Sequence, residues 1–349
     1  MPPTENESSA FSSRLTRAWY VACASAEFED GPVARTILGT PIVLFRGAGG
    51  APAALLDRCA HRNIALSLGK VVDRRLECAY HGWQYAEDGK CVKVPGLCGE
   101  AEKPARAVPR FAALEQDGFV WVFATPDAEP QGRPFAVPAL GEGAVEVRRV
   151  VEVESPLHAA LENALDVPHT AVLHRGLFRG ERAPCRIKAR VSRTPEGVQA
   201  EYLGEQRPGG WAAKILSPSG GVVTHFDRFI LPSIAQVEYR LGTEAHFLVT
   251  SICTPVEDFR TRLHAVISFR TRLPGWLVKL VLNPVAMKIF RQDASILKAQ
   301  GEALRRWGGA HYTSTAIDVL GLQIARLLRR AETGEEPGEE WSREIELEV

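Results

Sequence analysis

The strongest constraint on this chain is a pair of short metal-ligand motifs, Cys59-Ala-His61 and Cys78-Ala-Tyr-His81. Two thiolates and two imidazoles can hold a tetrahedral zinc ion, or a [2Fe–2S] cluster in which two His replace two Cys on one iron. Each motif carries one Cys and one His and is followed by a turn signal, Asn63 in the first and Gly82 in the second. Zinc fingers more often place both Cys in one half and both His in the other, so this pairing favours two opposed loops around a cluster.

Composition sets the class of protein. With 349 residues the chain is long enough for two domains, each with its own core. Lys+Arg and Asp+Glu number 42 each, and a net charge of zero argues against nucleic acid or an anionic membrane surface as the main partner. The seven cysteines are an odd number without disulfide-framework spacing, and the first residues do not read as a signal peptide. We therefore expect a cytoplasmic protein.

The most apolar helix candidate spans residues 273–290. Lys279, Pro284 and Lys288 interrupt it, and its apolar runs fall short of the roughly 20 residues that a spanning helix needs. We expect no transmembrane segment. The stretch is either a core or pocket-wall helix or a helix on a membrane surface, and its sparse polar face favours the former.

The order of the predicted elements indicates an α+β protein of two domains. Residues 19–124 form short alternating runs broken by Gly, Pro and Asp, which predict antiparallel sheets with hairpin turns, and residues 125–144 form a Pro-rich linker. Residues 145–331 combine strands with helices near 157–173, 283–307 and 314–331. An N-terminal segment, 1–18, precedes these domains, and the acidic tail, 332–349, is expected to be frayed or solvent-facing.

A second group of metal-ligand residues contains Asp166, His169 and His174. Two His and a carboxylate make the facial triad that binds Fe(II) and leaves positions open for O2. A step of five residues does not keep both His on one helical face, but they can converge if the helix loosens, for example where Pro168 opens a new turn. On spacing alone, the two His are equally well explained as partly buried structural residues.

Together, the two groups resemble the Rieske non-heme iron oxygenases. The His81-Gly82-Trp83 run, with Gly89 and Pro95-Gly96 beyond it, is similar to a Rieske domain, and Asn163-x-x-Asp166-x-x-His169-x4-His174 is similar to the catalytic domain. The resemblance implies a Rieske [2Fe–2S] cluster on four ligands: Cys59, His61, Cys78 and His81. It also implies a mononuclear Fe(II) on His169, His174 and Asp293. The alternative for Asp293 is a solvated carboxylate on a helix face.

The resemblance also assigns Asp166 and Asn163. In the family, the carboxylate that matches Asp166 bridges His ligands of the two sites across a subunit boundary; the alternative is that Asp166 orients His169 within one chain. Asn163 is expected near the iron as a neighbour of the site. The implied fold is an N-terminal all-β Rieske domain followed by a catalytic domain of the helix-grip, START-like type, with an apolar cavity beside the iron.

The implied function is that of an O2-dependent monooxygenase or oxidative demethylase of an apolar ring compound: an aromatic, a steroid or sterol, or a pigment. Residues 46–50 lack the third glycine of a dinucleotide fingerprint and predict a hairpin turn, so electrons from NAD(P)H must arrive through a partner. That partner is expected to be a ferredoxin or a flavin reductase, and the assembly a homotrimer. The alternative function is a non-catalytic START-like ligand-binding protein with a redox-sensing Rieske cluster, which requires a vacant iron site.

Overall fold

The computed structural model describes residues 15–29, 31–175, 186–205, 223–243, 245–272, 274–335 and 338–348. The chain divides into two compact units between Val137 and Pro138, a point inside the predicted linker 125–144. The predicted domain limits, 19–124 and 145–331, stay predictions. Of the predicted N-terminal segment 1–18, residues 1–14 lie outside the described residues.

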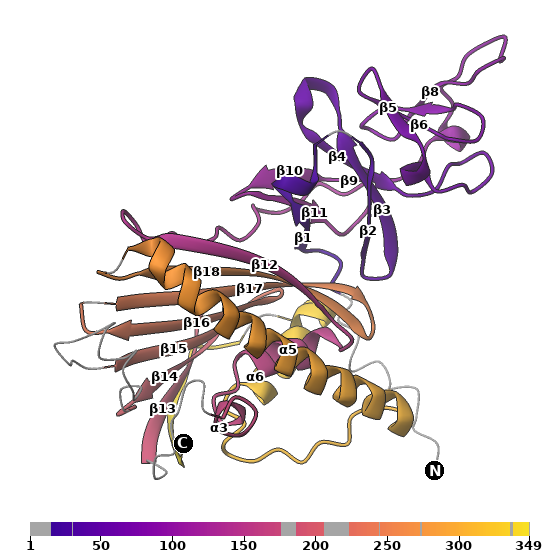
Figure 1. The fold of residues 1–349 in the computed structure, drawn as a ribbon. Helices are drawn as coiled ribbons and strands as arrows, with labels where there is room; N and C mark the ends of the chain where they lie inside the picture. The colour runs from indigo at the N-terminus through magenta and orange to yellow at the C-terminus, as the bar shows by residue number, and fades with distance from the viewer. Residues whose placement is uncertain are drawn as a thin grey trace. The chain divides into compact units, whose positions relative to one another are not determined.

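The first unit is built from three antiparallel sheets (Figure 1). One sheet has the order β1 (Trp19–Ala24), β11 (Phe119–Phe123) and β10 (Ala113–Gln116). The second has the order β2 (Val33–Ile37), β3 (Thr40–Arg46), β4 (Pro52–Leu56) and β9 (Arg110–Phe111). The third has the order β5 (Lys70–Val72), β6 (Arg75–Glu77), β7 (Gln84–Tyr85) and β8 (Cys91–Lys93). Four short 3-10 turns complete the unit: η2 (Ser25–Glu27), η3 (Ala48–Gly50), η4 (Leu66–Leu68) and η5 (Pro104–Arg106).

The glycine-rich segment at residues 47–50 joins β3 to β4, which pair antiparallel. Gly49 and Gly50 have φ of 68° and 80°, a left-handed conformation that glycine adopts without strain. The segment is therefore the hairpin turn predicted from the sequence.

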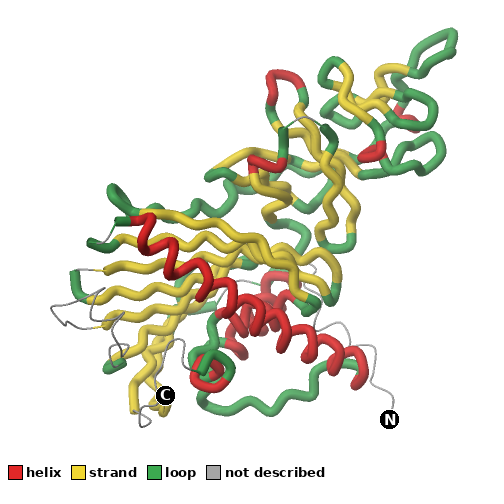
Figure 2. The backbone as a smooth tube through the Cα atoms, in the orientation of Figure 1, coloured by secondary structure: helices red, strands yellow, loops and turns green. Residues whose placement is uncertain are grey.

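The second unit contains one eight-stranded antiparallel sheet. Its strand order is β12 (Val145–Val153), β18 (Arg260–Arg270), β17 (Ala245–Glu257), β16 (Ile234–Leu241), β15 (Val223–Ile230), β14 (Gly197–Leu203), β13 (Arg186–Arg193) and β19 (Ser342–Glu348). Figure 2 shows that the long helices belong to this unit. They are α2 (Leu157–Ala164), α5 (Gly275–Trp307) and α6 (Gly321–Thr333), with a single turn, α3 (His169–Val172), between the first two.

One apolar core joins the sheet to these helices. Strand β15 alternates strictly between buried and partly buried residues, the period-two pattern of a sheet with one face in the core. The core cluster combines Tyr202 and Phe229 of the sheet with Leu161 of α2, Leu297 of α5 and Ile324 of α6. Helix α5 lies along β12 and contacts α2 (Figure 1). The predicted α+β class is confirmed.

Three sequence predictions need correction at the level of elements. The helix predicted near 157–173 is interrupted at 165–168, where Pro168 starts a new turn. The helix candidate at 273–290 and the helix predicted near 283–307 form one continuous helix, α5, which runs from Gly275 to Trp307 through Pro284. The tail that we expected to be frayed or solvent-facing is exposed at most positions, but it forms β19, which pairs with β13. Among the described residues, no helix is both long and apolar enough to cross a membrane.

Candidate metal centres

The Cys59 and Cys78 loops share one hydrogen-bond pattern. In each, the Cys N–H donates to the carbonyl five residues on, and the N–H four residues on donates to the Cys carbonyl, at 2.8 and 3.0 Å in the first loop and 2.8 and 3.1 Å in the second. The residues four positions on, Asn63 and Gly82, have left-handed φ of 58° and 69°. Asn and Gly tolerate this conformation, which explains the turn signal after each motif.

The loops bury both thiols and bring the two imidazoles together. Cys59 and Cys78 are 1% and 3% exposed, and the rings of His61 and His81 lie 4.6 Å apart between centroids. Burial, with the neighbouring Cys59 thiol, raises the pKa of Cys78, so this thiol keeps its proton until a metal displaces it. The Nδ1 atom of His61 is buried and has no hydrogen-bond partner among the described residues, which suits a nitrogen that binds metal.

Tyr85 belongs to this site, and the sequence analysis did not identify it. Its hydroxyl accepts a hydrogen bond from the Ala60 N–H (3.2 Å) and lies 3.3 Å from Cys59 Sγ, so its O–H can donate to the sulfur once Cys59 binds metal as a thiolate. Burial, together with Cys59, raises the pKa of Tyr85 and keeps this donor protonated. In the sequence, the only signal for Tyr85 is its position four residues after His81. In the structure it lies in β7, and both residues of that strand are buried.

The compact group in the second unit consists of His169, His174 and Asp293. The Nε2 atoms of the two His lie 3.3 Å apart, and Asp293 Oδ1 lies 3.0 Å from His174 Nε2 and 3.7 Å from His169 Nε2. His169 comes from α3, His174 from the turn after it, and Asp293 from the middle of α5. The structure therefore brings together the three residues that the sequence analysis named, although 119 residues separate His174 from Asp293 in the chain.

The outer nitrogen of each imidazole faces an oxygen acceptor. His169 Nδ1 contacts the backbone carbonyl of Asp166 and lies 3.3 Å from its carboxylate, and His174 Nδ1 lies 3.0 Å from Gln292 Oε1. A proton on each Nδ1 leaves the Nε2 lone pairs facing Asp293 Oδ1, which is buried and completes no hydrogen bond among the described residues. Three electron-rich atoms at this separation repel one another unless a cation lies between them.

Electrostatics at the triad also favour a cation. Burial lowers the pKa of His169, but the nearby Asp166 and Asp293 carboxylates outweigh it and raise the pKa to about 9. The carboxylates that stabilise a proton here stabilise a metal ion in the same way. Two imidazoles and one carboxylate match the donor set of mononuclear Fe(II).

Asp166 and Asn163 lie beside the triad. Asp166, in the turn between α2 and α3, also accepts a hydrogen bond from the His169 N–H at 3.1 Å, so it orients this residue within one chain. Asn163 is in the last turn of α2, and its carbonyl accepts a hydrogen bond from the Asp166 N–H at 3.4 Å. Gln292, which the sequence analysis did not assign, does for His174 what Asp166 does for His169.

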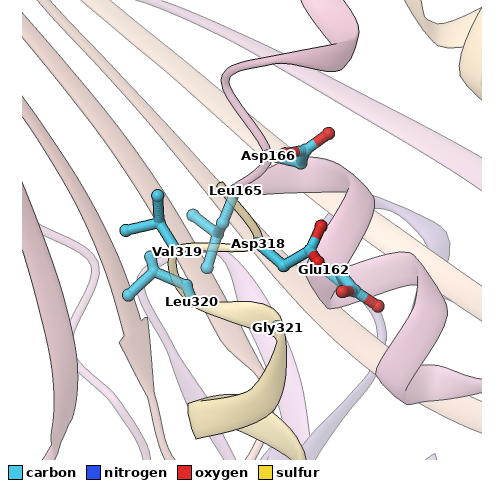
Figure 3. Close-up of a pocket in the computed structure, with 7 residues that line it drawn as sticks. All are labelled: Glu162, Leu165, Asp166, Asp318, Val319, Leu320 and Gly321. Atoms are coloured by element: carbon cyan, nitrogen blue, oxygen red, sulfur yellow. The ribbon is translucent and has the colours of Figure 1, made fainter. Parts of the chain in front are cut away.

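A small pocket borders Asp166 (Figure 3). Glu162 of α2 and the segment 318–321 at the start of α6 line it, together with Leu165 and Asp166. Burial and the charges of Asp166 and Asp318 raise the pKa of Glu162. Because three carboxylates line this pocket, it is not the apolar substrate cavity expected from the sequence.

Two family models match the chain. The Rieske [2Fe–2S] domain matches residues 18–109, and the vanillate O-demethylase oxygenase C-terminal domain matches residues 153–333. The first match contains the two Cys–His loops, and the second contains the triad. Together they cover most of both compact units.

Relatives and solved structures agree with these matches. Protein TIC 55, chloroplastic, of Arabidopsis thaliana is 29% identical over 83% of this chain and 54% of its own length. The oxygenase component of chloroacetanilide N-alkylformylase of Rhizorhabdus wittichii is 32% identical over 60% of this chain and 67% of its own length. The crystal structure of dicamba monooxygenase bound to 3,6-dichlorosalicylic acid matches 91% of this chain and 98% of its own chain, with a TM-score of 0.76 and 23% identity, which shows a shared fold. The chain spans about half the length of the first curated relatives.

Proposed function

The chain belongs to the Rieske non-heme iron oxygenases, as an oxygenase α-subunit, and on that premise we propose that it hydroxylates or oxidatively demethylates an apolar ring compound with O2. The family resemblance found in the sequence is thereby confirmed. Its two metal centres are a Rieske [2Fe–2S] centre and a mononuclear iron site at His169, His174 and Asp293.

The observation that carries this proposal is that three metal-binding side chains converge on one point. The two imidazoles among them are already oriented by hydrogen-bond partners. His169 and His174 present Nε2 because Asp166 and Gln292 occupy the opposite nitrogens. Bound iron with three protein ligands supplies open positions for O2 activation. The chain's own contribution is to hold two imidazole nitrogens and one carboxylate oxygen where they would bind the iron together.

We assign the [2Fe–2S] ligands to the two loops of the first unit. Cys59 and Cys78 would bind one iron, and His61 and His81 the other. The buried thiols, the adjacent rings and the free Nδ1 of His61 support this assignment. Electrons would come from NAD(P)H through a ferredoxin or flavin reductase, because the chain has no dinucleotide fingerprint of its own.

The substrate class follows from the relatives. One is named for a chloroacetanilide, and a solved structure holds 3,6-dichlorosalicylic acid; both compounds are small aromatic rings. The C-terminal family model is named for vanillate O-demethylase. An aryl ether or N-alkyl group on an apolar ring is therefore the substrate that we propose.

We further propose a homotrimer in which the cluster of one subunit serves the iron of its neighbour. A closed ring gives every iron one cluster. Asp166 already orients His169 and would complete the link by accepting a hydrogen bond from a cluster ligand of the neighbouring subunit, such as His81. The cytoplasmic location stays a prediction, since the relatives include a chloroplastic protein.

The non-catalytic alternative requires an iron site that cannot bind metal, and the assembled triad argues against it. A single-turnover assay tests the proposal: pre-reduced protein is mixed with O2 and a panel of apolar ring compounds that includes aryl methyl ethers. We expect at least one compound to accelerate oxidation of the cluster and to release a hydroxylated or demethylated product. Asp293→Ala should abolish both effects, whereas Glu302→Ala, an exposed carboxylate on the same helix, should not. Equal rates in wild type and Asp293→Ala would refute an oxygenase role for the triad.

A further inference from the structure

Two residues outside the ligand motifs form a stack on His61. The indole of Trp83 lies parallel to the His61 imidazole, with 4.7 Å between ring centroids and an interplanar angle of 2°. The Arg106 guanidinium carbon lies over the same indole, 6.0 Å from the ring centroid. A cation therefore lies one aromatic ring away from an imidazole that we assign to the cluster.

Arg106 is held in place by hydrogen bonds to backbone carbonyls. Its Nη1 donates hydrogen bonds to the backbone carbonyls of Glu100 (2.8 Å) and Ala101 (3.0 Å). Its N–H closes the turn η5 by donating to the Lys103 carbonyl at 2.9 Å. Among the described residues, no carboxylate lies within salt-bridge distance of Arg106, so its partners are neutral carbonyl dipoles.

The charge of Arg106 also reaches the interior beside the cluster loops. Burial raises the pKa of Cys91, and the Arg106 charge opposes that rise. Cys91 belongs to the same core cluster as Cys59 and Cys78. The guanidinium therefore acts on a group in the core that also contains Cys59 and Cys78.

One-electron reduction adds a negative charge to a [2Fe–2S] cluster, and a fixed cation nearby stabilises that added charge. Net charge, hydrogen bonds and solvent exposure around a cluster set its potential. An indole that covers one face of His61 also excludes water there and so preserves the effect of the cation.

We propose that Trp83 and Arg106 form a potential-setting cap on the cluster, in which the indole shields His61 and the guanidinium raises the reduction potential. The cap is a positioning and tuning element, and it rests on the proposed function because it needs His61 to be a cluster ligand. The only co-reactant is an external one-electron donor, which loses the electron that the cluster gains.

A redox titration of purified protein, followed by the optical and EPR signals of the cluster, tests this proposal. Arg106→Met should disfavour reduction three- to tenfold, which for a one-electron couple is a fall of about 28 to 59 mV. Arg106→Lys should keep most of the wild-type potential because it keeps the charge. Lys103→Met removes an equal charge from an exposed neighbour and should change the equilibrium less than twofold. Trp83→Leu should lower the potential in the same direction as Arg106→Met.

Two failures can be told apart. A wild-type protein without a Rieske spectrum would overturn the proposed function. A normal spectrum combined with equal midpoint potentials in Arg106→Met, Lys103→Met and wild type would overturn the cap alone. Should Arg106→Met not assemble a cluster, the comparison of Arg106→Lys with Trp83→Leu decides: an unchanged potential in Trp83→Leu contradicts the cap.

Discussion

The atom that faces one nitrogen of an imidazole decides whether the other nitrogen can bind a metal. At the iron site, the Asp166 carbonyl and Gln292 Oε1 occupy the outer nitrogens of His169 and His174. The motif around the two His and the short motif at Asp293 identified the ligands from sequence. Gln292 could not be assigned in that way, because an acceptor for Nδ1 has no required spacing from the His that it orients.

Gln292→Leu removes the acceptor for His174 and puts an apolar side chain of similar size in its place on α5. Loss of such an outer partner typically weakens metal affinity by about 10- to 100-fold, and we expect a loss in that range for the mononuclear iron. Gln292→Glu keeps an acceptor and should retain most of the affinity. Iron binding to metal-depleted protein, followed while the cluster spectrum stays intact, measures the effect. Equal affinity in Gln292→Leu and wild type would contradict this role.

Strand β19 is an element that the composition of its segment did not predict. The tail is rich in glutamate, which predicts a solvated segment, but Ile345 and Leu347 alternate with Glu344, Glu346 and Glu348. The apolar residues face the core, and Leu347 is 4% exposed within the core cluster. Helix α5 continues through Pro284, which cannot donate a backbone hydrogen bond, because packing along β12 and α2 keeps the helix continuous.

Leu347→Ala should destabilise the second unit by about 2–3 kcal/mol, because it removes a buried side chain from the edge of the core. Glu346→Ala, on the exposed face of the same strand, should change stability by less than about 0.5 kcal/mol. Urea denaturation of both variants measures the difference. If the two substitutions had equal effects, β19 would not be part of the folded core.

The centre of the sheet holds a buried histidine between two carboxylates. His225 of β15 stacks between Tyr202 and Tyr239 on the neighbouring strands, with centroids 4.5 and 3.9 Å away. Its Nδ1 lies 2.7 Å from Glu205 Oε2, and its Nε2 lies 3.0 Å from Asp227 Oδ1. With a carboxylate facing each nitrogen, the doubly protonated ring can donate one hydrogen bond to each. Burial lowers the pKa of His225, but the two carboxylates outweigh it and raise the pKa to about 9.

A raised histidine pKa contributes stability that is complete below the unfolded value of 6.5 and is lost as pH rises through about 9. We therefore expect the free energy of unfolding to fall by up to about 3 kcal/mol between pH 6.5 and pH 9. His225→Phe should be less stable at pH 6.5 and should lack most of this pH dependence. Denaturation curves at the two pH values test both statements. The same pH dependence in wild type and variant would assign it to other groups.

At the scale of the whole molecule, each metal site belongs to its own compact unit. The division falls within the Pro-rich segment that the sequence marks as a linker, and two family models match the two sides. The sequence therefore predicts which residues form each site. The sequence does not predict how subunits would pack together, because subunit contacts depend on surface residues that form no recognisable motif.

Asp166→Asn tests the proposed link between subunits. The amide keeps the size of the side chain but removes the charge, so both metals should bind while electron transfer from cluster to iron slows severely. Stopped-flow oxidation of the pre-reduced cluster, with substrate and O2 present, measures the rate. Wild-type rates in Asp166→Asn, or an active wild type that sediments as a monomer, would contradict the link.

Metal analysis of wild type and Asp293→Ala tests the central claim most directly. A [2Fe–2S] cluster plus one mononuclear iron predicts about three irons and two inorganic sulfides per chain in the wild type. Asp293→Ala should keep about two irons, both sulfides and an unchanged Rieske EPR signal. Stoichiometric zinc in place of iron and sulfide, or three irons retained in Asp293→Ala, would contradict the account.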